Sequence, residues 1–136
     1  MNHTTTKLIT LPVAGAPSDF RLTKLDAFSG ASLLRLLLKH LPENADAATL
    51  DQILPALFTA LPDAELHALM ALCLSHAEMK LDAGYVKVYA NDFWNIPELE
   101  YDPAACLRLT LEVALFSLEG FFGESGSPSG AAPRNT

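Results

Sequence analysis

The segment from Asp102 to Phe122 carries apolar residues on two opposite sides of a helix, which limits how this chain can fold. Both sets of residues follow helical spacing, and charged residues separate them along one edge. The first stripe consists of Leu107, Leu111, Leu115, Leu118 and Phe122, and the second consists of Leu109, Val113 and Phe116. A helix that is apolar all round is either enclosed by other elements or presents one face to a partner.

Both interpretations are open from the sequence. Enclosing a terminal helix is difficult in a chain of 136 residues, because a small domain has much surface for its volume. We expect the first stripe to be core. We predict that Leu109, Val113 and Phe116 bind a partner.

The composition favours one helix-rich domain. The chain is 50% hydrophobic and only 18% charged, and leucine is abundant. We expect a single globular, mainly helical domain over residues 1–123. The Gly/Ser/Pro-rich residues 124–136 have little to bury, and we expect a disordered tail there.

Charge and hydropathy exclude several partners. A net charge of -7 and scattered Lys and Arg residues disfavour nucleic acid and anionic membrane surfaces. No stretch reaches the roughly 18 apolar residues of a membrane span, and Met1 to Ala16 lacks the pattern of a signal peptide. We expect a cytoplasmic protein.

The first half of the chain predicts a short β hairpin followed by helices. Lys7–Val13 and Phe20–Leu22 are β-compatible around a Gly-Ala-Pro turn. A leucine-rich helix follows over Asp26–Leu41. Two further amphipathic segments, Leu50–Leu61 and Leu66–Ala77, predict a helical hairpin, in which Pro55 kinks the first helix or starts a new one.

The second half predicts a small β-rich insertion before the last helix. Tyr85, Val86, Val88 and Tyr89 favour a strand after a turn at Asp82–Gly84. Asp102-Pro103 then supplies an N-cap and a first-turn proline for the final helix. We therefore predict a mainly α (α+β) fold: a compact bundle of about four helices with a short N-terminal β hairpin and this insertion.

Neither cysteine predicts a metal site or a catalytic centre. Cys73 and His76 resemble half of a zinc site, but Cys106 has no Cys or His neighbour to supply the other half. We expect both cysteines to be buried as small apolar residues. We predict no metal, no cofactor and no catalytic residue.

The segment before the last helix combines carboxylates with aromatic residues. Acidic side chains beside an aromatic residue can form an acid/base pair in a sugar-binding cleft, but an acidic loop before a helix N-terminus has the same composition. Capping is the interpretation that we favour. The carboxylates are Asp92, Glu98, Glu100 and Asp102.

Trp94 is a further candidate for partner binding, because tryptophan offers a large amphipathic contact surface. The alternative is a loop anchor that packs over the helical core. The sequence leaves both interpretations open.

Several segments together resemble the tail assembly chaperones of long-tailed bacteriophages and prophages. The similar segments are Leu22-Thr-Lys-Leu-Asp-Ala-Phe28 before a leucine-rich helix, Leu74-Ser-His-Ala77 at a helix end, and Leu111-Glu-Val113 leading to Gly120-Phe-Phe-Gly123. The resemblance runs from about Leu8 to Gly123. One departure is Ala114-Leu-Phe-Ser117, where the family often has an asparagine before its aromatic residue.

This resemblance implies a non-enzymatic protein of the host bacterial cytoplasm. It implies binding to the tape measure protein, protection of that client from aggregation, and help in assembling the tail tube, whose subunit is a further potential partner. It also implies that a longer form made by translational frameshifting can exist. The alternative is a homo-oligomeric structural or regulatory helical protein without a client.

Overall fold

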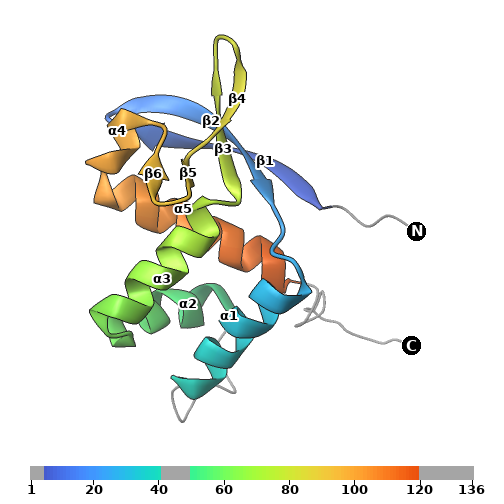
Figure 1. The fold of residues 1–136 in the computed structure, drawn as a ribbon. Helices are drawn as coiled ribbons and strands as arrows, with labels where there is room; N and C mark the ends of the chain where they lie inside the picture. The colour runs from blue at the N-terminus through green and yellow to red at the C-terminus, as the bar shows by residue number, and fades with distance from the viewer. Residues whose placement is uncertain (1–4, 41–49, 120–136) are drawn as a thin grey trace.

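A four-stranded antiparallel sheet lies over a layer of helices (Figure 1). The structure is a computed structural model that describes residues 5–40 and 50–119. The sheet has the strand order β1-β2-β3-β4, and β5 and β6 form a separate two-stranded ladder. The strands are β1 (Thr6–Val13), β2 (Ala16–Thr23), β3 (Ala77–Leu81), β4 (Gly84–Lys87), β5 (Tyr89–Ala90) and β6 (Phe93–Trp94). The helices are α1 (Ala27–Lys39), α2 (Leu50–Ala60), α3 (Asp63–Leu74), α4 (Pro97–Glu100) and α5 (Pro103–Leu118).

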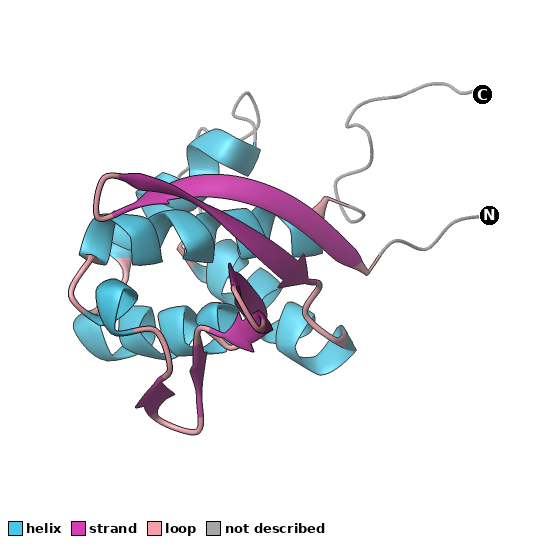
Figure 2. Cartoon of the chain, turned by 90° about the horizontal axis from the view of Figure 1, so that it is seen from above, coloured by secondary structure: helices cyan, strands magenta, loops and turns pink. Residues whose placement is uncertain are grey.

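The β1–β2 hairpin is longer than the sequence predicted, and it has a two-residue turn. Ala14 and Gly15 both adopt positive φ values, 50° and 83°, which is the conformation of the type I′ turn that suits the twist of a tight hairpin. The two strands pair from Thr6↔Thr23 to Val13↔Ala16. Seen from above, they cross over the helices (Figure 2), so that alternate side chains point into the core.

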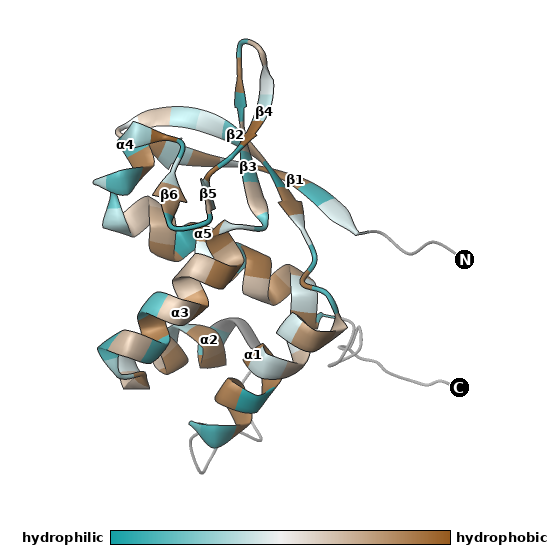
Figure 3. Cartoon of the chain, in the orientation of Figure 1, coloured by the Kyte–Doolittle hydropathy of each residue, from teal (hydrophilic) through white to brown (hydrophobic). Residues whose placement is uncertain are grey.

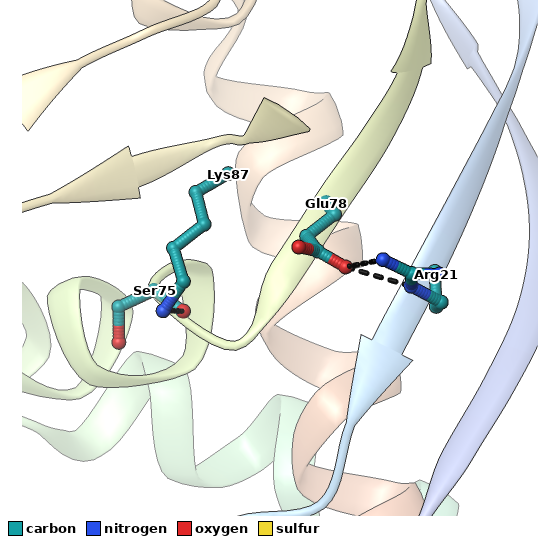
Figure 4. Close-up of polar contacts among 4 residues, drawn as sticks. All are labelled: Arg21, Ser75, Glu78 and Lys87. Carbon is teal, nitrogen blue, oxygen red and sulfur yellow. Dashed lines mark hydrogen bonds and ion pairs between the residues drawn. The ribbon is translucent and has the colours of Figure 1, made fainter. Parts of the chain in front are cut away.

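The β3–β4 hairpin joins the sheet through β2. Arg21 pairs with Glu78 in the register, and the guanidinium of Arg21 lies 2.7 Å from a carboxylate oxygen of Glu78 (Figure 4). Hydrogen bonding to Glu78 raises the pKa of Arg21. The same guanidinium stacks over the ring of Tyr85 on β4, 4.3 Å from its centroid. This contact ties the outer surfaces of β2, β3 and β4 together.

The predicted helical bundle with two minor β additions is wrong, and the fold is α+β. The N-terminal hairpin and the insertion before the last helix are halves of one sheet. Their union depends on pairing between residues 57 positions apart, such as Arg21 and Glu78. Periodicity along the chain reports local structure, so it could not show this pairing.

α5 is the centre of the molecule. It packs against α1, α2, α3 and α4 and also against β1 and β2 (Figure 1). Figure 3 shows the apolar residues gathered along α5 and the helices beside it. Within the helix the hydroxyl of Thr110 is buried and donates to the carbonyl of Cys106, so this polar group is satisfied. One side of α5 is therefore enclosed by its own chain, in agreement with the first of the two interpretations.

The expected directions of the two stripes are reversed. Leu109, Val113 and Phe116 are buried in the core. The first stripe is more exposed: Leu107, Leu111 and Leu115 are half-buried, Leu118 is buried, and Phe122 lies outside the described residues. The strands β1 and β2 and the helices α2 and α3 all pack against α5. The position of these elements, and not the spacing of residues along α5, decides which side of the helix is buried most deeply.

Two lysines complete the cover of Phe116. The ammonium groups of Lys7 on β1 and Lys24 lie 5.8 Å and 5.2 Å from the centroid of its ring. Lysine can lay its apolar stem over a hydrophobic surface while its charge stays in water. Near the same end of α5, the hydroxyl of Ser117 accepts a hydrogen bond from the backbone N–H of Leu25. These contacts hold the start of α1 and the end of α5 together.

The remaining helices differ from the predictions in detail. The predicted start of the first helix at Asp26 is close to the observed one, and Asp26 caps α1 by accepting a hydrogen bond of 2.7 Å from the N–H of Ser29. α2 continues as one helix through Pro55. α2 and α3 follow one another directly, but both pack most extensively against α5, which corrects the predicted helical hairpin. Helix α4 was not predicted, and the tail 124–136 lies outside the described residues.

The packing of α5 predicts unequal effects of leucine truncation. Leu109→Ala should lower the free energy of unfolding by about 2–5 kcal/mol, because it opens a cavity in the core. Leu111→Ala, on the half-buried side of the same helix, should cost clearly less. Urea denaturation followed by circular dichroism measures both. Equal losses for the two variants would contradict the reversed orientation of the stripes.

Candidate partner-binding surface

Trp94 is held in position by a very short hairpin. Asn91 and Asp92 form its turn with φ values of 52° and 64°, a conformation that Asn and Asp tolerate better than most residues. The register then sets Trp94 opposite Tyr89. Their rings meet edge to face, with centroids 5.0 Å apart and an interplanar angle of 66°.

The hairpin is anchored to the rest of the fold by Val88. This residue is fully buried, and its N–H donates to the carbonyl of Ala77 at the start of β3. Its carbonyl accepts from the N–H of Asn95, just after β6. The backbone of Val88 therefore links the β5–β6 ladder to the end of α3 and to the main sheet.

An apolar pocket lies between this hairpin and α3. Its volume is about 80 Å³, well below the roughly 300–1,000 Å³ of typical small-molecule sites. The α3 residues that line it are spaced i, i+3, i+4 and i+7, so they share one face of the helix. A pocket of this size and chemistry suits a single apolar side chain. It is lined by His67, Met70, Ala71, Leu74, Tyr89 and Trp94.

Tyr89, which lines the pocket on the hairpin side, carries a hydroxyl that is hard to ionise. Burial raises the pKa of the Tyr89 hydroxyl, and the neighbouring carboxylate of Asp92 raises it further. Tyr89 is thus neutral at physiological pH, and its hydroxyl lies 3.4 Å from an oxygen of Asp92. His67 is exposed at the rim.

The loop-anchor interpretation of Trp94 agrees with its packing, and its role in partner binding stays a prediction. The side chain is half-buried and packs against the core, as a loop anchor does. It also lines the pocket together with the α3 face. The sequence assigned Met70 and Leu74 to a core stripe and did not single out Ala71, because spacing along α3 could not show which element would face it. Leu109, Val113 and Phe116 do not line this pocket.

The acidic segment contributes a helix cap. One oxygen of Asp102 accepts from the N–H of Ala105 at 3.1 Å, and the other accepts from the N–H of Ala14 at 3.1 Å. Asp102 therefore caps α5 and ties it to the β1–β2 turn, 88 positions away. Glu98 and Glu100 lie on α4, in its first turn, and are exposed. The capping interpretation is correct for Asp102.

The two cysteines are buried and free. Burial raises the pKa of Cys73 to about 12 and, together with the nearby Asp102 carboxylate, that of Cys106 to about 11. The thiol of Cys106 donates to the carbonyl of Leu99 at 3.1 Å. The ring of His76 lies within 2.9 Å of the carbonyl of Leu72. Among the described residues, no three His, Cys, Asp or Glu side chains form a group suited to a metal ion.

Large apolar side chains are also exposed elsewhere on the described surface. They are scattered over several elements rather than gathered into one patch. The residues are Leu8, Phe28, Leu38, Leu81, Phe93 and Tyr101. None of the described helices has the length and apolar character needed to cross a membrane.

Comparison with known protein families gives one match that covers most of the chain. The family model described as phage tail assembly chaperone protein, TAC, matches residues 16–130, which is most of the chain. The protein belongs to the phage tail assembly chaperone family. This confirms the resemblance noted from the sequence. No curated protein and no solved structure matches the chain.

The cysteines of this tail assembly chaperone should be unreactive in the folded state. A thiol with a pKa of about 11 is thiolate in only about one molecule in a thousand at pH 8, and the thiolate is the nucleophile. We expect negligible labelling of Cys73 and Cys106 by a disulfide reagent at pH 8, and full labelling in denaturant. Fast labelling of either thiol without denaturant would contradict the observed burial.

Proposed function

We propose that this member of the tail assembly chaperone family is a non-enzymatic protein that binds the tape measure protein in the host cytoplasm. It keeps that long client soluble and assists assembly of the tail tube. Family membership supports the general role. The pocket between α3 and Trp94 is the structural observation that supports binding of an apolar segment.

The proposed contact is a helix laid along α3. An amphipathic client helix places one apolar side chain in the pocket, between Met70 and Trp94, and adjacent side chains along the outer surface of α3. Burial of apolar surface contributes about 25 cal/mol per Å², and a single small pocket limits the total. Each contact is therefore weak, which suits a client that has to be released when the tube forms.

Trp94 is the proposed anchor of this contact. Its ring is fixed by Tyr89 and by the backbone links of Val88, so little side-chain entropy is lost on binding. Aromatic residues in such fixed positions are common among the residues that dominate binding energy.

Leu109, Val113 and Phe116 enter the proposal in an indirect role. They are core residues of α5, and α5 is the element against which α3 packs most extensively. They therefore support the pocket from below rather than form its surface. Substituting them should weaken binding only together with stability.

Filling the pocket tests the proposal. Ala71→Leu places extra apolar volume in the pocket while keeping a residue that favours helix. The tape measure protein encoded beside the tail tube gene should co-purify with the unaltered chain and stay soluble when the two are co-expressed. Ala71→Leu should weaken that association by about tenfold or more, which corresponds to about 1.4 kcal/mol.

Ala68→Leu is the matched control. Ala68 lies on α3 between the pocket residues His67 and Met70, but it is exposed and does not line the pocket, so this variant should bind as the unaltered chain does. Equal binding by both variants would show that the client contacts another surface. Failure of the unaltered chain to retain the tape measure protein would overturn the proposed function itself.

A further inference from the structure

The outer edge of β1, a strand of eight residues, is not paired with any strand in the described part of the chain. β1 pairs with β2 on one side, and in the sheet order it has no neighbour among the described strands on the other. The N–H of Lys24 donates to the carbonyl of Thr5, so the backbone groups of Thr5 face β2. Every second residue after Thr5 along β1 faces β2 in the same way. Because these groups alternate along a strand, Thr6, Leu8 and Thr10 direct their N–H and C=O groups away from β2.

Lys7 and Pro12 protect this edge of β1 in part, but no charged side chain stands at the three positions that direct both backbone groups outward. Edge strands are usually short or carry charged side chains that prevent pairing with another chain. At the other end of the sheet, β4 has only four residues and carries Lys87. On β1 the charge of Lys7 lies by the ring of Phe116, and the side chain of Leu8 is 68% exposed.

The pattern of β1 is symmetric about Leu8. The residues that present backbone groups to the edge read Thr6, Leu8, Thr10, which is the same in both directions. An antiparallel copy with Leu8 on the two-fold axis sets Leu8 opposite Leu8 and Thr6 opposite Thr10, and each pair exchanges two hydrogen bonds. Pro12 has no N–H to donate, so the pairing ends beyond Thr10.

Neighbouring charges permit this arrangement. In the register of the sheet, Leu8 lies beside Arg21, whose charge is compensated by Glu78 at 2.7 Å. The carboxylate of Asp19 accepts from the hydroxyl of Thr10, on its own β hairpin. In the symmetric pairing, Thr10 faces Thr6 of the other copy, and no acidic residue of one β1 edge faces an acidic residue of the other.

We propose that the β1 edge pairs with the β1 edge of a second copy of this chain, forming a two-fold dimer with a continuous sheet. The dimer is weak, because a single strand pair buries less than the roughly 1,200–2,000 Å² of stable interfaces. It forms through a surface different from the pocket at Trp94, and it does not depend on the proposed client.

Sedimentation of the full chain over a range of concentrations tests the dimer. The unaltered chain should pass from monomer to dimer as concentration rises. Leu8→Glu sets like charges opposite each other on the axis and should weaken the dimer by at least about tenfold. Leu81→Glu makes the same change at an exposed leucine at the end of β3 and should leave the dimer intact.

Cross-linking tests the position of the axis. Residues that face each other in a hydrogen-bonded pair have Cα atoms about 5.5 Å apart, within the range that a disulfide spans. Leu8→Cys should therefore form a covalent dimer under mild oxidation, whereas Leu81→Cys should not. The native cysteines do not compete, because both are buried.

The proposal requires both results together with native circular dichroism of each variant. A chain that stays monomeric at every concentration overturns it. So does a dimer that survives Leu8→Glu or fails to cross-link through Leu8→Cys, because such a dimer would use another surface. Pairing of β1 only with an extended segment of a tail protein would likewise overturn it.

Discussion

The enclosure of α5 is the constraint on which the rest of the structure depends. This helix has apolar residues around most of its circumference, and it can be stable in water only if other elements cover nearly all of it. The sheet, the helices α1 to α3 and the short α4 each contribute part of that cover. Phe116 in the last turns of α5 is buried, and the ammonium groups of Lys7 and Lys24 lie over its ring.

The candidate binding surface follows from that enclosure. α3 is fixed against α5, and the chain leaves α3 directly into β3, so the end of the helix and the start of the sheet are positioned together. The backbone links of Val88 then bring the β5–β6 hairpin against the free face of α3. The pocket lies between α3, which packs on the core, and the β5–β6 hairpin, which is hydrogen-bonded to the sheet.

The two proposed contact surfaces use different physics. The pocket at Trp94 offers burial of an apolar side chain, which is non-directional and tolerates many client sequences. The β1 edge offers backbone hydrogen bonds, which are directional and impose a register. A protein that has to hold a long client loosely but associate with itself in a defined way can use both. The first needs only apolar surface, and the second needs a matching strand.

Local signals in the sequence predicted most of the helices and strands, and short segments indicated the class of protein. Asp26 and Asp102 marked the starts of two helices, Asp82–Gly84 marked a turn, and Trp94 was singled out before its surroundings were known. These signals are local, because caps and turns depend on a few adjacent residues. The class of protein was predicted from the short segments that resemble the tail assembly chaperone family.

The contacts between elements could not be predicted from these local signals. Pairing of β2 with β3 joined two separate β segments into one sheet and turned the predicted bundle into an α+β fold. The same packing reversed the directions of the α5 stripes and set Ala71 beside Trp94. The physical reason is that hydrophobic spacing shows that a residue will be covered, whereas the covering element is chosen by contacts between residues far apart in the chain.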